Sequence, residues 1–551
     1  MVTEPLFGLE TEYALRARGA AGGTRDHSHA LLQLCHLARN RLVNLPDYRT
    51  TGMYLGNGAR FYVDTGGHPE FCTPECSDPW EVVRYTLAGE RILGSLAQRM
   101  RRRRSFSDAT FHKCNVDYSG SNSTWGCHES YLHRAEPDVL SRQLIPHFVS
   151  RIVYTGAGGF IAKSPGVEFT LSPRTFHLTN VITSDSVSRR GIYHTKDEPL
   201  GDRSYHRLHV ICGEALCSQL AQVLKVGTTA LIVRILEAGD RPADGLDLSR
   251  PLVAMRAIAR DPSCRVTVAL SRGGGVTAVE IQRRYLEAVA SRLNKSYMPS
   301  WAAEICELWL EVLDCLEQDP RLMSTKLDWA IKRDLFRSHI HRRGMTEDAT
   351  CKWTYVAKEI LSGVVSEYGW TDSLVDLMDN PRFNLGGAVS DLLDGFAKRN
   401  GLRWEDLRGF LALREELFEI DTRFGELGDR GIFNALDSKD LLSHRLQRVS
   451  NVGEAMTKPP LRGRANKRGQ MITRLQKRGA GGSRYGCGWE SIIDRREGKV
   501  YDLFDPYGRD AAWRPAAEDE VVRGISASVT FHGERDAGGL RRMLARATRR
   551  L

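Results

Sequence analysis

The stretch NGARFYVDTGGHPEFCTPE, residues 57–75, decides the fold. In its first half the polar side chains of Arg60, Tyr62 and Asp64 alternate with apolar ones. Successive side chains of a β-strand point to opposite faces of the sheet. The segment therefore predicts a strand with a charged front and an apolar back.

Two other segments repeat this pattern at a distance along the chain. Glu10 and Glu12 are two residues apart in FGLETEYAL (7–15), and Arg207 and His209 are two apart in RLHVIC (207–212). Three such strands indicate one sheet, with helices on the apolar face. A merely solvated face would carry mostly threonine, serine and lysine. Convergent acidic, histidine and arginine side chains favour a functional site instead.

The residue types on this face suit nucleotide chemistry. Clustered carboxylates with a histidine, and without cysteine ligands, favour magnesium held beside phosphates, and arginine forks bind phosphate oxygens. The segment 115–129, which contains His128 and Glu129, is expected to form a loop over the same face. The chain has no P-loop and no G-x-G-x-x-G before a suitable helix, so a sheet-based ATP site is expected.

Other catalytic motifs are absent from the sequence. It has no G-x-S-x-G, no H-E-x-x-H and no kinase H-R-D. Cys127 and His128 could be imagined as a nucleophile beside its base, but neighbours in a strand face opposite ways. Cys127 is therefore predicted to be structural.

Composition places the chain among ordinary globular proteins. Of 551 residues 41% are apolar and 26% charged. No apolar run approaches eighteen residues, so no membrane span is expected, and the N-terminus MVTEPLFG has no signal-peptide pattern. The twelve cysteines contain no C-x-x-C pair, which favours reduced thiols in a cytoplasm.

The net charge is +10, from 78 basic and 68 acidic residues, and part of the excess lies in Arg101–Arg104 and 535–551. Charge runs are most often solvated surface. The alternative is attraction of an acidic partner, whether nucleic acid, nucleotide or protein. Charge alone leaves these open.

Periodicity predicts an α+β organisation without internal repeats. Helical patterns cover 80–100, 140–154, 215–237, 279–293, 302–317, 326–338, 354–368 and 402–424. A strand hairpin is predicted at 489–494 and 499–504. The polar, glycine- and lysine-rich stretch 458–484 is expected to be flexible or to face substrate. We predict a catalytic domain over 1–440, a small C-terminal domain over 441–510 and a basic extension over 511–551.

Several motifs together resemble one family, that of Pup ligases and Pup deamidases. They are GLETEY (8–13), the stretch 57–75, GCHESYL (126–132), TKDEP (195–199), YHRLHVI (205–211), LKVGTTAL (224–231), KLDW (326–329), FEID (418–421) and PPLRGR (459–464). The resemblance covers most of the chain, up to about Gly508. It implies a fold similar to glutamine synthetase and gamma-glutamyl-cysteine ligase: an antiparallel sheet that cradles ATP and Mg²⁺, helices on one face, and a small C-terminal domain.

The resemblance also implies roles for individual residues. The implied magnesium contacts are Glu10, Tyr62 and Glu70; the implied ATP contacts are Arg60 and Thr73, with Trp489 bordering the nucleotide; and Asp64 is the implied catalytic carboxylate. From the same polar face we add Glu12, Glu129 and His209 as candidate metal ligands and Arg207 as a candidate nucleotide contact.

Two activities occur in the family that the chain resembles. The ligase phosphorylates the side-chain carboxylate of Pup's C-terminal glutamate, and a protein lysine then attacks, which marks that protein for the proteasome. The deamidase hydrolyses the C-terminal glutamine amide of Pup or the isopeptide bond. The spacing DTGGHPE from Asp64 to Glu70 matches the ligase's D-x-G-x-H-P-E, whereas the deamidase pattern DHAHPE is one residue shorter. The short interval between Tyr13 and Asn57 leaves little room for the deamidase's long insertion.

We therefore expect an ATP-dependent ligase that joins an acidic Pup-like modifier to lysines of protein substrates in the cytoplasm. The deamidase or depupylase is the alternative, and NVD at 115–117 and RGI at 190–192 look more like that branch. Ligation of a free amino acid or metabolite on the same fold and nucleic-acid binding through the basic stretches are further hypotheses. A basic groove would speed encounter with an acidic, disordered modifier.

Overall fold

The centre of the protein is a nine-stranded sheet. The computed structural model describes residues 4–19, 27–103, 106–185, 188–368, 395, 398–399, 401–477 and 484–517. The strand order is β11-β12-β13-β8-β1-β6-β5-β4-β3, and every neighbouring pair is antiparallel except β11 and β12. The strands are β1 (Phe7–Glu12), β3 (Asn44–Pro46), β4 (Met53–Leu55), β5 (Arg60–Val63), β6 (Pro69–Cys72), β8 (Cys127–His133), β11 (Asn180–Thr183), β12 (Gly191–His194) and β13 (His206–Val210).

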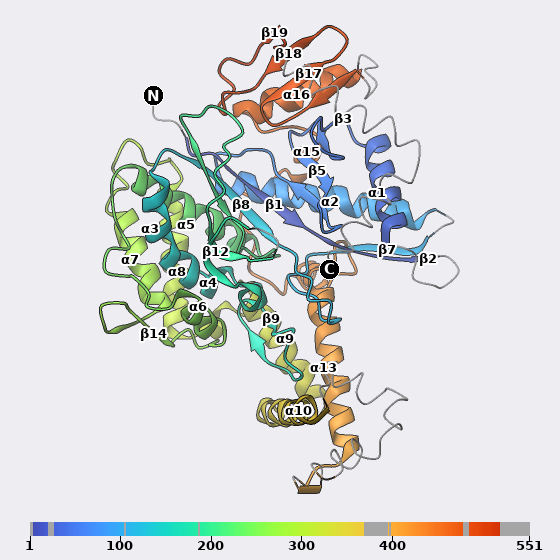
Figure 1. Ribbon diagram of the computed structural model, residues 1–551, viewed down its shortest axis with the longest axis vertical. Coiled ribbons are helices and arrows are strands. Elements are labelled where there is room, and N and C mark those ends of the chain that lie inside the picture. Colours follow the sequence, from blue (N-terminus) through green and yellow to red (C-terminus); the bar gives the residue numbers. More distant parts are fainter. Residues whose placement is uncertain are drawn as a thin grey trace.

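Helices cover the back of this sheet, as predicted. Leu9, Tyr131 and Leu208, from β1, β8 and β13, join one core with side chains of the helices. The helices of this layer are α2 (Pro79–Arg101), α3 (Pro137–Ser150), α5 (Gln219–Glu237), α7 (Ala278–Ala290) and α8 (Ala302–Gln318), and Figure 1 shows α3, α5, α7 and α8 grouped on one side of the strands. The α+β prediction is confirmed.

Helix α5 is long and apolar enough to cross a membrane by length and composition. However, 89% of that stretch is buried inside the protein, as in the core helix of a globular domain. Helix α2 begins where the sequence signals it, because the Asp78 side chain accepts hydrogen bonds from the backbone N–H groups of Trp80 and Glu81, with Pro79 in the first turn.

Further elements surround the sheet and its helices. They are β2 (Ala14–Gly19), α1 (His27–Arg41), β7 (Phe106–His112), α4 (Ile152–Thr155), β9 (Gly159–Phe160), β10 (Phe169–Thr170), η1 (Pro173–His177), α6 (Pro251–Ala259), β14 (Thr267–Ala269), β15 (Gly275–Thr277), η2 (Pro320–Met323), α14 (Ile432–Asp437) and α15 (Val452–Ala455). Helix α15 packs against α2, and Val452 and Ala455 belong to the core behind the sheet.

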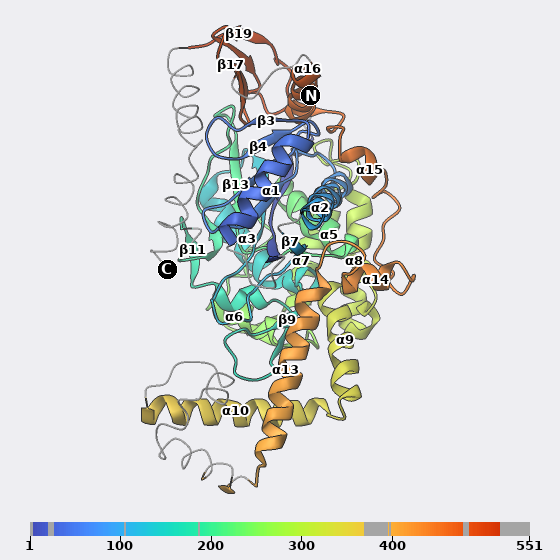
Figure 2. The same ribbon diagram turned by 90° about the vertical axis from the view of Figure 1, so that its right-hand side faces the viewer.

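Three helices form an arm below the sheet. They are α9 (Asp328–Arg342), α10 (Glu347–Tyr368) and α13 (Trp404–Phe424), and Figure 2 shows α10 and the start of α13 extending away from the body. A small apolar core joins the three helices to β9. A buried ion pair of 2.7 Å between Lys332 and Asp421 fixes α9 to α13 close to the main body.

The C-terminal unit consists of α16 (Gly463–Lys477) and a four-stranded sheet of β16 (Tyr485–Cys487), β17 (Ser491–Asp494), β18 (Lys499–Asp502) and β19 (Trp513–Pro515). The predicted hairpin is present as β17 and β18. In Figure 1 this unit lies above the end of the sheet formed by β3 to β5. Residues 518–551, which make up most of the basic extension predicted for 511–551, lie outside the described residues.

The stretch 458–484 was expected to be flexible or to face substrate. Its residues 463–477 form helix α16, so this part is not flexible. Two of its basic side chains are buried: Arg464 donates to Glu75 at 2.6 Å, and Arg468 pairs with the other oxygen of the same carboxylate. Arg468 also donates to the backbone oxygens of Gly58 and Trp489. The basic pattern resembles a solvated loop, but these charges face inward and fix the C-terminal unit to the sheet. Of the stretch, residues 478–483 are outside the described part.

Candidate active site

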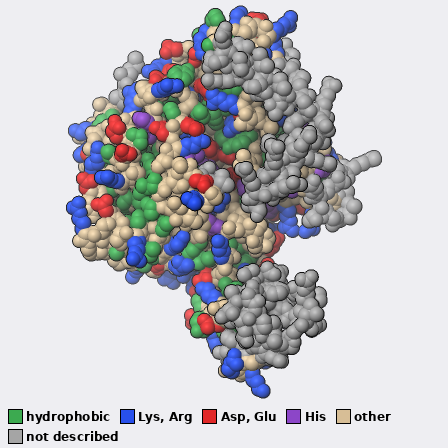
Figure 3. Space-filling model, viewed as in Figure 1, with side chains coloured by type: hydrophobic (Ala, Val, Ile, Leu, Met, Phe, Trp, Pro, Cys, Tyr) green, Lys and Arg blue, Asp and Glu red, His purple; other side chains and the backbone are tan. Residues whose placement is uncertain are grey.

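The front of the sheet collects polar side chains from five strands. Directly opposite residues of paired strands point to the same face. Glu10 of β1 lies opposite Cys72 and His128, Glu12 lies opposite Glu70, and Tyr62 also lies opposite Glu70. Arg207 and His209 of β13 reach the same face beside β8. Figure 3 shows acidic and histidine side chains together near the centre of this side of the molecule.

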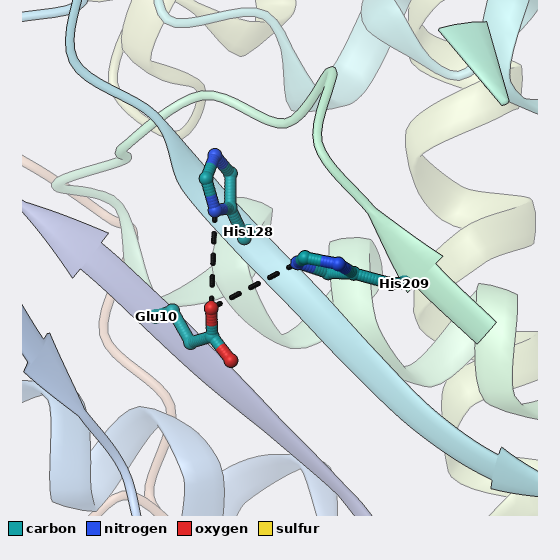
Figure 4. A group of neighbouring side chains, drawn as sticks. All are labelled: Glu10, His128 and His209. Carbon is teal, nitrogen blue, oxygen red and sulfur yellow. Dashed lines mark ion pairs between the residues drawn. The ribbon is translucent and has the colours of Figure 1, made fainter. Parts of the chain in front are cut away.

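Glu10 is the centre of the first cluster. Its Oε1 accepts a 2.8 Å hydrogen bond from Arg207, and its Oε2 lies 3.8 Å from His128 Nδ1 and 3.8 Å from His209 Nε2. Figure 4 shows the two imidazoles pointing at this carboxylate from neighbouring strands. Burial alone would raise the pKa of Glu10, but Arg207 and the two histidines lower it well below its usual value. The carboxylate is therefore ionised.

A second cluster lies two residues further along β1. Glu12 Oε2 accepts a 2.8 Å hydrogen bond from the Gly126 N–H and lies 3.5 Å from His68 Nδ1, which is 3.4 Å from Asp64 Oδ2. Against the effect of burial, His68 and His128 lower the pKa of Glu12 to about 2. Burial alone would lower the pKa of His68, but Asp64 and Glu12 raise it to about 9.

Asp64 follows directly after β5, and a turn positions it. The backbone N–H of His68 donates to Asp64 Oδ1 at 2.6 Å, and the His68 ring packs against Trp125 with 5.3 Å between centroids. The Asp64 side chain remains 20% exposed. It is thus held in place and still accessible to a substrate.

The two clusters together can hold a divalent cation. Glu70 is 3% exposed, and burial together with Glu10 and Glu12 raises its pKa well above the usual value. Among the described residues, the Oε1 of Glu70 and both ring nitrogens of the buried His209 have no hydrogen-bond partner. Carboxylates close together with free acceptor atoms suit a hard cation such as Mg²⁺, whereas imidazoles are ligands that transition metals prefer.

A cavity of about 300 Å³ lies beside the Glu10 cluster, between the sheet and the C-terminal unit. The predicted site residues in its lining are Glu10, Arg60, Tyr62, Thr73, Arg207, His209 and Trp489. Three further lining residues were not predicted: Lys196, Glu198 and Arg464. Lys196 and Glu198 belong to the motif TKDEP, and Arg464 belongs to PPLRGR. These motifs could have identified the three residues, but residue spacing alone does not predict that they lie on this face.

Contacts within the sheet hold the walls of the cavity. Arg60 donates to Asp47 at 2.9 Å, and its guanidinium lies 3.9 Å from the centroid of the Tyr62 ring. Thr73 Oγ1 accepts a 3.0 Å hydrogen bond from the Leu9 N–H. The Trp489 ring is perpendicular to that of Tyr54, at 5.3 Å between centroids.

Glu129 does not lie in this site. The loop expected over 115–129 is strand β8 from Cys127 onward, so alternation places His128 and Ser130 in front and Glu129 behind. Glu129 is fully buried there and accepts hydrogen bonds from Arg151 at 2.6 and 2.9 Å. The expectation that Glu129 is a metal ligand is therefore wrong, because its side chain lies in the core between the sheet and the helices. His128 is the residue that was missed, although the phase of the strand could have identified it.

Comparisons with known proteins agree with this architecture. The chain matches the family described as "Pup-ligase protein" over residues 5–355 and 388–493. It is 32% identical over 465 residues to the Pup deamidase/depupylase of Mycobacterium tuberculosis, covering 82% of this chain and 77% of that protein. It is 35% identical over 356 residues to the Pup–protein ligase of Brachybacterium faecium, covering 61% of this chain and 72% of that protein.

Two solved structures share the fold. The complex between prokaryotic ubiquitin-like protein Pup and its ligase PafA matches with a TM-score of 0.67 and 22% identity, covering 96% of this chain and 93% of the other. The ligase PafA in complex with ADP matches with a TM-score of 0.61 and 22% identity, covering 87% and 90%. At this identity the likeness establishes the fold, including the mixed sheet and the small C-terminal unit.

Proposed function

This chain belongs to the Pup-ligase family, and from that premise we propose that it is an ATP-dependent ligase joining the C-terminal glutamate of a Pup-like modifier to protein lysines. The observation that carries the proposal is the front face of the sheet. There a cluster of carboxylates lies between Asp64 and a cavity lined by arginine and lysine side chains, with the ligase spacing from Asp64 to Glu70.

The cavity is the proposed nucleotide site. Arg60, Arg207, Lys196 and Arg464 supply positive charge for phosphates, and Trp489 supplies a flat wall for the base. Thr73 is part of the same lining. The Glu10 cluster adjoins the cavity, so phosphates bound there would lie next to the carboxylates.

Trp489→Ala is expected to weaken ADP binding roughly ten- to a hundredfold, because stacking of a base on an aromatic ring contributes about 1–3 kcal/mol. Isothermal titration calorimetry would measure the effect. Trp513→Ala is a matched control, since Trp513 belongs to the same small unit and packs on Tyr501 outside the cavity. Equal weakening in both variants would contradict a role for Trp489 in the nucleotide site.

The proposed magnesium ligands are Glu10, Tyr62 and Glu70, with Glu12, His128 and His209 on the same face. When bound, Mg²⁺ supplies positive charge that neutralises the phosphates during transfer. We expect EDTA to abolish conjugation and excess Mg²⁺ to restore it. Conjugation that persists in EDTA would contradict this assignment.

The proposed reaction has two steps. A side-chain carboxylate oxygen of the modifier's terminal glutamate attacks the γ-phosphorus of ATP, the bond to ADP breaks, and an acyl phosphate forms. The lysine ε-amine then attacks the acyl carbon, the bond to the phosphate oxygen breaks, and an isopeptide forms. Asp64, fixed by the His68 N–H, accepts the proton that the amine loses. Arg207 and the cavity cations stabilise the developing negative charge.

The deamidase/depupylase is the alternative, because the relative of that name from Mycobacterium tuberculosis matches 82% of this chain. One incubation separates the two activities: the protein with ATP, Mg²⁺, a lysine-bearing protein, and Pup ending in glutamate or in glutamine. The ligase produces a conjugate from the glutamate form with one ADP per bond. Deamidation of the glutamine form, or cleavage of a conjugate without any ligation, would sink the ligase proposal.

We place the reaction in the cytoplasm, in a pathway that delivers proteins to the proteasome. All twelve cysteines are free thiols, as in a reducing compartment. The net charge of +10 suits an acidic modifier.

A further inference from the structure

His68 contacts both oxygens of the proposed base, Asp64. Its backbone N–H donates to Asp64 Oδ1 at 2.6 Å, and its ring nitrogen Nδ1 lies 3.4 Å from Asp64 Oδ2. Gly66, between the two residues, leaves the carboxylate accessible, because a Cβ added there would lie 3.3 Å from both of its oxygens. The orientation of the Asp64 carboxylate therefore depends on where the His68 ring is held.

The His68 ring has a neighbour on either side. Its Nδ1 lies 3.5 Å from Glu12 Oε2, and the indole of Trp125 packs against the ring with 5.3 Å between centroids and 46° between planes. Gly126, the residue after Trp125, donates its N–H to the same oxygen of Glu12 at 2.8 Å. Two successive residues of one loop thus fix both neighbours of the imidazole.

The backbone at Trp125 is fixed as well. Val116 and Thr124 form an antiparallel bridge, and the Trp125 N–H donates to the Asn115 backbone oxygen at 3.2 Å. The Asn115 side chain in turn exchanges two hydrogen bonds with the backbone of Ala215, at 2.8 and 3.1 Å. The indole is therefore presented to His68 from a backbone that is anchored to the body of the protein.

Trp125 contributes the surface of its ring and not its N–H group. The side chain is half-buried, and among the described residues its Nε1 has no hydrogen-bond partner. A buried donor without a partner costs stability, whereas the packing of an aromatic ring contributes to it. A phenylalanine ring at this position would supply the same kind of contact to His68.

We propose that Trp125 is a positioning residue for the ligation step: through His68 it holds Asp64 in the orientation that accepts the lysine proton. This inference rests on the proposed function and deepens it. A general base has to lie within hydrogen-bond reach of the proton, and a displacement of about 1 Å can cost roughly a hundredfold in rate. Trp125 does not line the nucleotide cavity, so ATP binding and formation of the acyl phosphate do not depend on it.

Trp125→Ala is expected to lower the single-turnover rate of conjugation roughly ten- to a hundredfold, with the KM for ATP unchanged. Trp125→Phe keeps the packing surface and is expected to retain a rate close to that of the wild type. Trp353→Ala is the matched control, because it removes another half-buried indole, one that stacks on Phe410 in the arm. It is expected to conjugate normally. An equal loss of rate in Trp125→Phe and Trp125→Ala would show that the indole N–H acts directly, and would overturn the proposal.

Two further measurements separate positioning from a general loss of structure. Hydroxylamine, supplied in place of the lysine substrate, attacks the acyl phosphate without a general base and gives a hydroxamate and phosphate. Trp125→Ala is expected to form this hydroxamate at the wild-type rate. In the Asp64→Asn background, Trp125→Ala is expected to cost less than about twofold more in conjugation, because two changes that act through one group are not additive.

Either of two results contradicts the positioning role: a hydroxamate rate that falls as far as the conjugation rate, or a full further loss in the Asp64→Asn background. Where conjugation by the double variant is too slow to measure, the hydroxamate rate decides. A wild-type protein that forms neither conjugate nor hydroxamate would instead refute the proposed ligase.

Discussion

Asp64→Asn is expected to lower the conjugation rate by about 10²–10⁴-fold while leaving ADP binding within twofold of the wild type. The amide is nearly isosteric with the carboxylate, but it cannot accept the proton from the attacking amine, and general-base catalysis typically contributes a factor of this size. Asp64 does not line the nucleotide cavity, so the nucleotide contacts are unaffected. Single-turnover conjugation at saturating ATP would measure the rate, and calorimetry the affinity.

Asp261→Asn is a suitable control, since Asp261 is half-buried in a turn after α6, outside the site. It is expected to behave as the wild type in both measurements. A normal rate in Asp64→Asn would remove Asp64 from the reaction. A large loss of ADP affinity would show that the residue belongs to the nucleotide site.

Glu129→Gln is expected to lower the free energy of unfolding by about 3–5 kcal/mol, the typical cost of breaking a buried ion pair by removing one partner. Glu129 accepts two hydrogen bonds from Arg151 and one from Tyr131, and Lys225 lies 3.7 Å away. The glutamine leaves both buried cations without their counter-charge. Urea unfolding would show a lower midpoint with an unchanged slope.

Glu311→Gln provides the comparison for Glu129→Gln. It removes an exposed ion pair with Lys326 of similar length, 2.6 Å, and is expected to cost less than about 1 kcal/mol. The folded Glu129→Gln protein should retain the magnesium requirement of the wild type. A stable variant with a raised magnesium requirement would return Glu129 to the metal site.

The front face could be predicted best where strands are short and polar residues alternate strictly with apolar ones. Glu10 and Glu12 on β1, and Arg207 and His209 on β13, share a face because each pair is spaced by two residues. They meet Tyr62 of β5 because β8 joins β1 to β13 and β6 joins β1 to β5. The sheet order and the distances could not be predicted, since they depend on which strands pair, and β1 pairs with β8 across more than a hundred residues.

The two failures have a common physical cause. In segment 115–129, glycine and serine suggested a loop, but backbone pairing with β1 and β13 makes β8 a central strand and exchanges the faces of His128 and Glu129. In α16, a polar, glycine- and lysine-rich pattern suggested a flexible or substrate-facing segment, but Arg464 and Arg468 pair with Glu75 inside the protein. In both cases the partner that decides the outcome is remote in sequence.

The central claim is that this sheet activates the modifier's carboxylate by phosphorylation. The direct measurement is oxygen transfer: Pup whose terminal side-chain carboxylate is labelled with ¹⁸O is conjugated in the presence of ATP, and the released phosphate is analysed by mass spectrometry. The account predicts one ¹⁸O atom in the phosphate for each isopeptide bond formed. Isopeptide formation with unlabelled phosphate would contradict it.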